Sequence, residues 1–372
     1  MTFRGRELRS TITADGQLTL SLDEVTTADP GDDEVVVRIE ATPINPSDLG
    51  LLIGPADVTT VTQTGPARAT LSVPAPRLGM VAARIGQSLP AGNEGAGTVV
   101  AAGRNVTGLQ GRLVGMAGGS MYADYRKLRA QDVTPLPAGA TAADGASIFV
   151  NPLTALGFVE TARAEGHKAI IHTAAASNLG QMLQKICLAD GVPLINVVRS
   201  QAQVDLLRGV GATHVLNSQD TDFFDRLTDA AASLNATIAF DALGGGSLGS
   251  DILRAMEAAA ARTMSTYSRY GSNTFKQLYI YGGLDTGPTV LNRTGFGFLW
   301  SISGWLLPPF LAKAGPEVAA RLRQRVSDEL TTTFASHYTR VIGLAEALQP
   351  EILRAYERKA TGEKFLIDPT RG

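Results

Sequence analysis

The chain has 372 residues, of which 44% are hydrophobic and 18% charged, and its formal net charge is −2. That length suggests two domains, and the balanced charge provides no basic face for binding nucleic acid or an anionic membrane. The single cysteine, Cys187, excludes a disulfide framework and a thiolate zinc cluster. The first residues contain no apolar segment of the secretory type, so we expect a cytoplasmic protein.

Short strands separated by turns are predicted from residue 1 to about 140, including DEVVVRIEATPIN at 33–45 and GTVVAAGRNVTGLQGRLVGMA at 97–117. Glycine-punctuated strands of this kind favour a partly closed barrel or a sandwich. Residues 55–90 are rich in Thr, Ala and Pro and have no clear period. We predict a long loop there, with no more than one hairpin, that shapes a substrate entrance or an interface.

Strands and helices alternate after residue 145, which is typical of βαβ units with a parallel sheet. The predicted strands are 168–173, 193–199, 213–217, 236–245 and 277–283, and the predicted helices are 177–191, 200–211, 220–235 and 246–262. The last forty residues hold one or two helices and a final strand, KFLID at 364–368. We expect this tail to rejoin the first domain. The predicted domains are therefore 1–145 completed by 330–372, with a doubly wound parallel sheet at 146–329 inserted between them.

The apolar stretch FGFLWSISGWLLPPFLA occupies residues 296–312. It falls short of the roughly 20 residues that a membrane span needs, and it contains Gly304 and the pair Pro308–Pro309. We predict a buried or interface-facing helix that ends at the prolines. The alternative is an exposed apolar patch used for self-association or for an apolar substrate.

The first βα turn of the parallel-sheet region reads AIIHTAAASNLGQML. A dinucleotide site needs a tight turn here, so that a helix N-terminus directs its free N–H groups at the pyrophosphate. The three positions of the G-x-G-x-x-G pattern are Ala175, Ser177 and Gly180, so only the last glycine is present. Ser177 could bond a phosphate oxygen, or it could simply cap an ordinary helix.

The second strand of this region ends in VVRSQ, which puts Arg199 where an acidic residue would bind the ribose hydroxyl of NAD. A guanidinium is a bidentate partner for a phosphate, so Arg199 favours the 2′-phosphate of NADP. The alternative is a solvated arginine at a strand end. We expect NADPH as the cofactor.

Nine short sequence motifs, spread over nearly the whole chain, occur in the order in which a known protein family has them. They are INPSD (44–48), GNEGAG (92–97), the YADY pair around Tyr122 and Tyr125, NPLTA (151–155), HTAAASNLGQ (172–181), INVVR (195–199), GATHVLN (211–217), FDALGG (240–245) and TGEKFLID (361–368). Together they resemble the zinc-independent medium-chain dehydrogenase/reductases, most closely the quinone oxidoreductase and 2-enoyl thioester reductase branches. The resemblance implies a Rossmann domain inserted into a GroES-like, β-rich catalytic domain, a cofactor between the two domains, and a homodimer.

The resemblance also implies roles for individual residues along the cofactor. Asn45 and Asp48 would lie near the nicotinamide, and Tyr122 joins them as a candidate catalytic residue. The other cofactor-binding residues implied are Thr154, Ala175, Ser177, Asn178, Leu179, Gly180, Arg199, Asn217, Leu243, Gly244, Tyr281, Gly282, Gly283, Leu284 and Lys364. Each has a plainer alternative, because Asn45 and Asp48 could cap a turn, Thr154 could cap its helix and the glycines could make turns.

The histidines, His167, His172, His214 and His337, are scattered and form no i,i+4 pair, so no zinc site is expected. No G-x-S-x-G motif indicates a hydrolase either. The remaining chemistry is direct hydride transfer to an electron-poor carbon, with donors aimed at a conjugated carbonyl oxygen.

The thioester-reductase branch places a catalytic tyrosine shortly after its NPSD motif, but NPSDLGLLIGPADVTT at 45–60 contains none. Tyr122 and Tyr338 are the candidate substitutes. The missing tyrosine favours a quinone or conjugated enone as substrate, whereas INVVR and NPLTA favour the alternative, a 2-enoyl thioester. A third hypothesis is a protein that binds NADPH without turnover.

Overall fold

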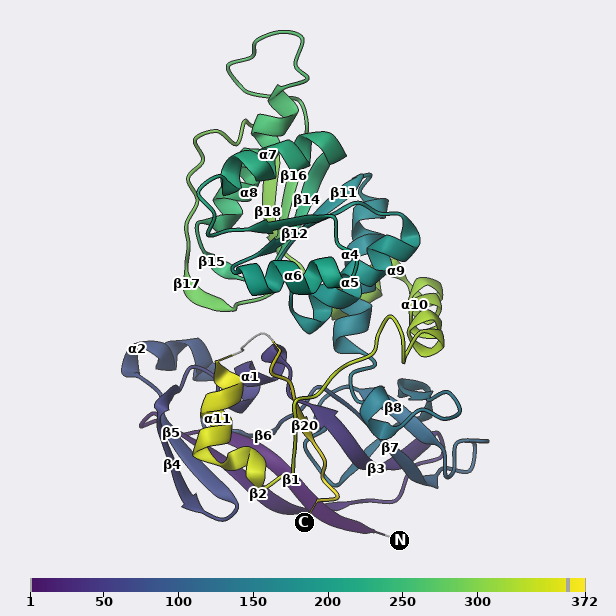
Figure 1. Cartoon of the computed structure of the whole chain (residues 1–372). Coiled ribbons are helices and arrows are strands. Elements are labelled where there is room, and N and C mark those ends of the chain that lie inside the picture. The colour runs from purple at the N-terminus through teal and green to yellow at the C-terminus, as the bar shows by residue number, and fades with distance from the viewer. Residues whose placement is uncertain (1, 359–361, 372) are drawn as a thin grey trace. The chain divides into compact units, whose positions relative to one another are not determined.

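The computed structural model describes residues 2–358 and 362–371, so the first residue of the TGEKFLID phrase lies outside the described part. The chain folds into two compact units (Figure 1). Unit 1 comprises Met1–Val150 and Gln324–Gly372, and unit 2 comprises Asn151–Arg323. Unit 2 is thus inserted into the chain of unit 1.

The first sheet of unit 1 has the strand order β4-β5-β2-β1-β6. Its strands are β1 (Phe3–Ile12), β2 (Gln17–Thr27), β4 (Asp57–Gly65), β5 (Arg68–Ser72) and β6 (Ser88–Pro90). Leu8, Ile12, Leu18 and Leu20 alternate with more exposed residues and are fully buried. This period of two is what a strand with one face on the core requires.

The second sheet of unit 1 has the order β10-β8-β7-β3-β20-β19, and β9 also pairs with β3. Its strands are β3 (Glu34–Pro43), β7 (Glu94–Ala102), β8 (Leu113–Ala117), β9 (Tyr125–Arg129), β10 (Val133–Pro135), β19 (Arg340–Ile342) and β20 (Phe365–Ile367). The tail therefore rejoins the first domain, as predicted, because β20 pairs antiparallel with β3, with Leu366 opposite Pro43.

Short helices complete unit 1. They are α1 (Pro46–Leu52), α2 (Ala75–Leu78), η1 (Gly79–Arg84), η2 (Ala130–Asp132), α3 (Ala142–Gly145), η3 (Glu346–Leu348) and α11 (Pro350–Glu357). Leu49 and Leu52 of α1 share a core with Ile352 and Leu353 of α11 and with β1 and β2. Segments from both ends of the chain thus form one hydrophobic core.

The prediction of a long loop at 55–90 was wrong. The segment contains an antiparallel hairpin, β4 and β5, that extends the first sheet through the pairing of β5 with β2. The threonine- and valine-rich run from Val58 to Thr64 has high β propensity, and Val61 and Leu71 bury their side chains in the core of unit 1. Only the presence of one hairpin was foreseen.

Unit 2 has a parallel sheet of order β13-β12-β11-β14-β16-β18. The strands are β11 (Ala169–Thr173), β12 (Leu194–Val198), β13 (His214–Asn217), β14 (Ala236–Asp241), β16 (Lys276–Ile280) and β18 (Trp300–Gly304), with a separate pair β15 (Gly244–Gly246) and β17 (Asp285–Thr289). Every residue of β11 and β12 is buried. Strands covered on both faces are apolar throughout, which explains why the sequence revealed them.

The helices of unit 2 are α4 (Val150–Ala164), α5 (Asn178–Asp190), α6 (Gln201–Gly209), α7 (Phe223–Leu234), α8 (Leu248–Ala261), α9 (Leu307–Ala314) and α10 (Pro316–Asp328), the first and last of which extend into unit 1. Leu227 of α7 and Ile252 of α8 pack on Ile171 and Ile195 of the sheet. Phe158 of α4 stacks on Phe240 and lies beside His172. The predicted doubly wound α/β arrangement is confirmed.

The prediction of a helix ending at Pro308–Pro309 was also wrong. Residues Trp300–Gly304 form the edge strand β18, and α9 begins at Leu307 with the prolines in its first turn. Proline is tolerated there because the first helical N–H groups have no partner within the helix. Among the described residues, no helix combines the length and apolar character needed to cross a membrane.

Candidate active site

The turn between β11 and α5 explains why two fingerprint glycines are dispensable. The left-handed backbone falls on Ala174, with φ of 49°, and not on Ala175 or Ser177. Ser177 is the N-cap of α5, and its Oγ accepts a hydrogen bond from the Gly180 N–H at 3.1 Å. A Cβ at Gly180 would lie 2.1 Å from the Ala175 carbonyl oxygen, so the third glycine is required for the helix to approach the turn.

Arg199 follows β12 directly, and its side chain is exposed. Its backbone N–H donates to Gln203 Oε1 at 3.0 Å, which leaves the guanidinium outside that hydrogen bond. Because β12 runs parallel to β11, with Val197 opposite Thr173, Arg199 and the Ala174–Gly180 turn follow the same edge of the sheet. This is the edge at which doubly wound sheets bind nucleotides.

Asn217 ends β13, opposite Val198 of β12. Its Nδ2 donates to Asp220 Oδ1 at 2.9 Å, and its Oδ1 accepts from the Gln219 N–H at 3.2 Å. Both groups of the amide therefore shape the following turn.

Asp241, which sequence reasoning did not identify, organises the turn after β14. Its carboxylate accepts from Thr173 Oγ1 at 2.6 Å and from the Leu243 and Gly244 N–H groups at 3.1 Å each. Thr173 Oγ1 in turn accepts from the Ala242 N–H at 2.8 Å. These hydrogen bonds therefore hold the end of β11 and the turn after β14 together. They also fix the position of the predicted residues Leu243 and Gly244.

The Tyr281–Leu284 segment packs against this turn. The Tyr281 N–H donates to the Asp241 carbonyl at 3.0 Å, and the Leu284 N–H donates to the Ala242 carbonyl at 3.1 Å. A Cβ at Gly282 would lie 2.5 Å from the Ala242 oxygen, so glycine permits the close approach. Gly283 has open space around its Cα.

A buried histidine holds Tyr281. His172 Nε2 lies 2.8 Å from the Tyr281 hydroxyl, and the two rings stack. Burial lowers the pKa of His172 to about 3, so the ring is neutral at physiological pH. Burial also raises the pKa of Tyr281.

Thr154, in the second turn of α4, is buried in unit 2.

In unit 1, Asn45 and Asp48 begin helix α1. The Asp48 carboxylate accepts from the Asn45 N–H and from the Asn93 N–H, each at 2.8 Å. Burial raises the pKa of Asp48 to about 7. Asp48 thus caps the helix and ties it to the Asn93 segment.

Glu94 is fully buried beside Asn45 and was not identified from the sequence, although it lies within GNEGAG. Its Oε1 accepts from Asn45 Nδ2 at 2.7 Å, and its Oε2 accepts from the Phe149 and Val150 N–H groups at 2.9 and 2.8 Å. Burial raises the pKa of Glu94. Asn45 Oδ1 is buried and has no hydrogen-bond partner among the described residues, so it is an acceptor available to a ligand.

The structure favours a packing role for Tyr122 over the catalytic role predicted from the sequence. The side chain is fully buried, and its hydroxyl donates to the Pro43 carbonyl at 3.1 Å. Burial raises its pKa well above the usual value. Lys364 also lies in unit 1, where its Nζ donates to Ser147 Oγ at 2.8 Å.

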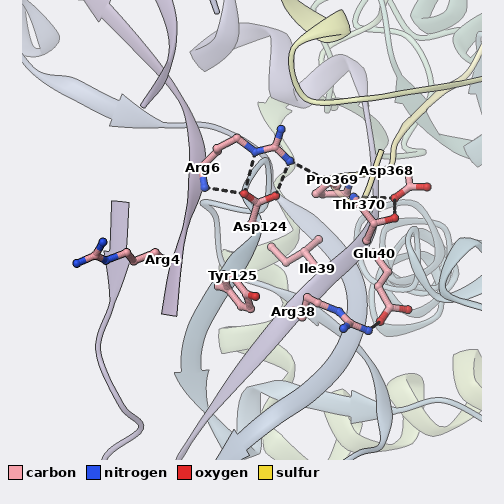
Figure 2. Close-up of a pocket in the computed structure, with 10 residues that line it drawn as sticks. All are labelled: Arg4, Arg6, Arg38, Ile39, Glu40, Asp124, Tyr125, Asp368, Pro369 and Thr370. Carbon is pink, nitrogen blue, oxygen red and sulfur yellow. Dashed lines mark hydrogen bonds and ion pairs between the residues drawn. The ribbon is translucent and has the colours of Figure 1, made fainter. Parts of the chain in front are cut away.

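Unit 1 also has an open hollow of about 740 Å³ that includes Arg4, Arg6 and Arg38 (Figure 2). Arg6 forms a two-pronged ion pair with Asp124, and Arg38 pairs with Glu40 at 2.9 Å. Two of its three arginines are therefore already neutralised, and the hollow is not a prepared anion site. Among the described residues, no group of three or more His, Cys, Asp and Glu side chains could hold a metal ion.

The folds of unit 1 and unit 2 together correspond to a known two-domain arrangement. A parallel, doubly wound unit inserted into a β-rich unit is the Rossmann plus GroES-like arrangement of the medium-chain dehydrogenase/reductases, and the solved structures that match the chain share it. No protein-family model matches the chain.

Solved structures and curated proteins point to two kinds of reductase. A candidate NADPH:quinone reductase from Mesorhizobium loti is 26% identical, with a TM-score of 0.72 over 98% of both chains. The enoyl thioester reductase of Candida tropicalis, in a mutant form, has a TM-score of 0.67 at 19% identity, over 98% of this chain and all of that one, and shows the fold alone.

Among curated proteins, the mitochondrial enoyl-[acyl-carrier-protein] reductase of Bos taurus is 29% identical over 253 residues, 64% of this chain. The match spans 58% of the bovine protein. The human enzyme is 27% identical, and the match covers 63% of this chain and 57% of that enzyme. The chain therefore resembles both branches named from its motifs.

Proposed function

We propose that the chain is an NADPH-dependent reductase that transfers hydride to a quinone or a related conjugated enone without a metal. The observation that carries this proposal is the edge of unit 2 where the Ala174–Gly180 turn and the exposed Arg199 follow adjacent parallel strands. A helix N-terminus suits a pyrophosphate, and a guanidinium suits a 2′-phosphate. The metal-free chemistry follows from the residue types, since one cysteine cannot furnish a zinc alcohol dehydrogenase site.

The residues present fit NADPH. Gly180 lets the first turn of α5 pack closely on the preceding turn, because a side chain there would overlap the Ala175 carbonyl. Ala175, Ser177, Asn178 and Leu179 would line the pyrophosphate with Gly180, and Arg199 would hold the 2′-phosphate. Leu243, Gly244 and the Tyr281–Leu284 segment would lie along the rest of the nucleotide, and Thr154 and Asn45 near its nicotinamide.

Bound NADPH supplies hydride from C4 of the nicotinamide. The contribution of the chain is orientation and polar groups around the reacting carbonyl. Asn45 is prepared for orientation, because Glu94 holds its Nδ2 and leaves its Oδ1 as a fixed acceptor. Asp48 and Asn93 fix the helix that carries it.

A second candidate is reduction of a 2-enoyl thioester, which the similarity to mitochondrial enoyl-[acyl-carrier-protein] reductases favours. The absence of a tyrosine from residues 45–60 counts against it. The third candidate is a protein that binds NADPH without turnover. It differs from the first two because it would reduce no substrate.

One assay separates these candidates: the loss of nicotinamide absorbance when the full chain is mixed with NADPH and an acceptor. We expect oxidation with quinones or simple enones and little with crotonyl thioesters. The reverse preference would replace the first candidate by the second, and no oxidation with any acceptor would leave only the third.

A homodimer belongs to the same proposal, on the strength of the resemblance. Size-exclusion chromatography with light scattering should give twice the 39.0 kDa chain mass. A monomer at assay concentration would remove the dimer from the proposal without touching the chemistry.

A further inference from the structure

We propose that Tyr338, Ser147 and Lys364 form the proton-delivery relay of this reductase, with Tyr338 as the donor to the substrate. The inference rests on the proposed function and extends it, because reduction of a conjugated carbonyl needs a proton as well as a hydride. Two hydrogen bonds, one cation–π contact and their position within unit 1 carry it.

The three side chains form a continuous hydrogen-bonded chain. The Tyr338 hydroxyl lies 2.8 Å from Ser147 Oγ, and Lys364 Nζ donates to the same Oγ at 2.8 Å. Lys364 Nζ also lies 5.2 Å from the centroid of the Tyr338 ring. A hydroxyl that both donates and accepts can pass a proton between a phenol and an ammonium group.

Pairing of the chain tail holds Tyr338 and Lys364 in register. Strands β19 and β20 are parallel, with Arg340 opposite Phe365. Next to this pair, the Thr339 N–H donates to the Lys364 carbonyl at 2.9 Å, and the Lys364 N–H donates to Thr339 Oγ1 at 3.1 Å. Ser147 comes from the segment after α3 and is buried, whereas Tyr338 and Lys364 are partly exposed. The relay therefore reaches the surface of unit 1.

The charges around the relay suit proton transfer. Glu94 and Asp48 favour the ammonium form of Lys364, but burial is the larger effect and lowers its pKa to about 8. Burial raises the pKa of Tyr338, Glu94 and Asp144 raise it further, and hydrogen bonds from Ser147 and Ser336 oppose this. Tyr338 is thus protonated at rest, and the nearby cation stabilises its anion when the proton leaves.

Two other tyrosines of unit 1 already have hydrogen-bond partners in the protein. The Tyr122 hydroxyl donates to Pro43, and the buried Tyr356 hydroxyl donates to the Ala347 carbonyl at 3.1 Å. Tyr338 has instead a polar partner that is itself bonded to a cation. This assigns Lys364 a different role from the cofactor contact that the resemblance implies.

The proposed reduction conserves atoms, electrons and protons. Hydride from the reduced nicotinamide forms a C–H bond at the electron-poor carbon, or an O–H bond at a quinone oxygen, and the conjugated π pair moves to the far carbonyl oxygen. The oxyanion takes the proton of Tyr338, and the phenolate regains one from Ser147. Ser147 takes its replacement from the Lys364 ammonium, and water reprotonates Lys364. One NADPH and one solvent proton are consumed for each two-electron reduction.

The first test uses the protein without cofactor. Tyrosine labelled with ¹³C at Cζ is titrated by NMR, and the Tyr338 signal is assigned by its loss in Tyr338→Phe. We expect this signal to shift with an apparent pKa near that of Lys364, about 8, and the shift to vanish in Lys364→Gln. An unchanged titration in Lys364→Gln would overturn the coupling on which the relay depends.

The second test is turnover with an enone or quinone that the wild type reduces. We expect Tyr338→Phe to lower kcat by about 10²-fold with NADPH affinity unchanged, since a positioned general acid contributes about 10²–10⁴-fold. Ser147→Ala, which breaks the chain but leaves the phenol, should lower kcat by about tenfold or more. Tyr356→Phe, which removes a buried hydroxyl outside the relay, is the matched control and should keep the wild-type kcat.

The pH profile distinguishes a relay from a merely structural cluster. Wild-type kcat should fall as the pH rises through about 8, where Lys364 loses its proton. Lys364→Gln should lose this decline, and Lys364→Arg should keep a high rate above it. A Tyr338→Phe variant with wild-type kcat, or a Lys364→Gln variant that keeps the decline, overturns the relay while the proposed function stands. A wild type inert with every acceptor overturns both.

Discussion

Gly180 is the one fingerprint glycine that this chain has kept, and packing explains why. The turn takes its left-handed residue at Ala174, so Ala175 and Ser177 need no glycine, whereas the space at Gly180 is filled by the Ala175 carbonyl. In the sequence, the signal for this turn was the small size of the residues at all three fingerprint positions. Which of the three positions tolerates a side chain depends on backbone geometry that composition does not encode.

Gly180→Ala should therefore damage both stability and nucleotide binding. Its Cβ would lie 2.1 Å from a carbonyl oxygen, and relief of such a clash costs about 1–3 kcal/mol. We expect a lower melting temperature and a weaker NADPH fluorescence titration. Gly209→Ala in α6 is the control, because nothing lies within 4 Å of its Cβ, and it should not destabilise the chain. Equal behaviour of the two variants would refute the packing argument.

Arg199→Glu should weaken NADPH by at least tenfold and leave NADH much less affected, because the substitution opposes the 2′-phosphate and favours a free hydroxyl. Equilibrium titration with both nucleotides measures this. Arg208→Glu, at an exposed position on α6, controls for the change in net charge. Equal weakening of both nucleotides would remove Arg199 from the phosphate site.

His172 should make the protein less stable in acid. Its folded pKa of about 3 lies below the unfolded value of about 6.5, so below pH 6.5 the unfolded chain binds a proton that the folded chain refuses. The contribution of His172 is thus present above pH 6.5 and is lost as the pH falls toward 3. Between pH 7 and pH 5 the loss should be about 2 kcal/mol.

Urea unfolding at these two pH values provides the measurement. His172→Phe should show a smaller loss than the wild type, whereas His337→Gln, at an exposed position, should match it. If His172→Phe kept the full pH dependence, the buried neutral imidazole would not be its source.

Strands were predictable from the sequence where both of their faces are buried. They were less predictable where the strand is defined by pairing with a neighbouring strand. The parallel strands of unit 2 are apolar on both faces and were found from the sequence. The β4–β5 hairpin was foreseen only as one hairpin within a long loop, and the edge strand β18 was missed, because each is defined by pairing with a neighbouring strand, β2 or β16. The prolines at 308–309 were taken as a helix end, although they stand equally well in a first turn.

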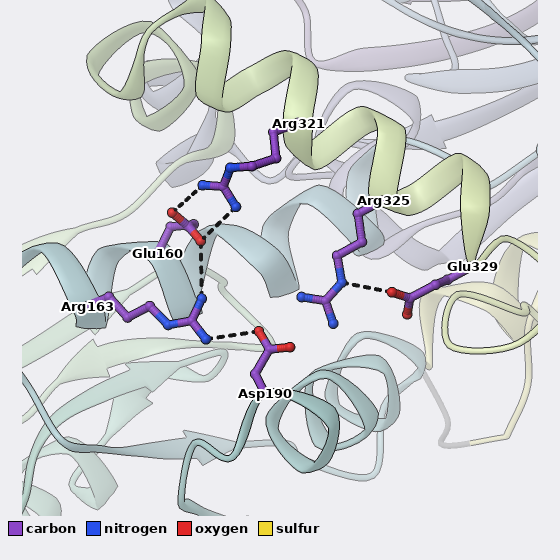
Figure 3. Close-up of polar contacts among 6 residues, drawn as sticks. All are labelled: Glu160, Arg163, Asp190, Arg321, Arg325 and Glu329. Atoms are coloured by element: carbon purple, nitrogen blue, oxygen red, sulfur yellow. Dashed lines mark hydrogen bonds and ion pairs between the residues drawn. The ribbon is translucent and has the colours of Figure 1, made fainter.

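Surface ion pairs connect α4, α5 and α10 within unit 2 (Figure 3). Glu160 of α4 pairs with Arg321 of α10 at 2.8 Å and with Arg163 at 3.4 Å, and Arg163 also pairs with Asp190 of α5 at 3.0 Å. Arg325 pairs separately with Glu329 at 2.9 Å. Arg163 and Arg321 are about half exposed, so solvent screens the network that they form with Glu160 and Asp190.

Glu160→Ala should consequently lower the stability of the chain by no more than about 1 kcal/mol. The difference in melting temperature from the wild type should shrink in about 1 M salt, where charges are screened within a few ångströms. Scanning calorimetry at low and high salt checks both points. A large loss that is independent of salt would mean that Glu160 acts by packing instead.

On the scale of the whole molecule, insertion of one unit into the other brings distant segments to the same sites. Residues near 338 and 364 meet those near 45, 94 and 147 in unit 1 because the tail adds β20 beside β3. The sequence predicted that the tail returns, but not that Glu94 would hold Asn45 or that Lys364 would reach Ser147. Such contacts depend on register between strands far apart in the chain, which local patterns do not specify.

The central claim is that the edge of unit 2 beside Gly180 and Arg199 binds NADPH. A crystal structure of the full chain with NADPH tests it most directly. We predict the pyrophosphate at the N–H groups of the Ser177–Gly180 turn and the 2′-phosphate against the Arg199 guanidinium. A nucleotide bound elsewhere, or a 2′-phosphate that projects into solvent away from Arg199, would contradict the account.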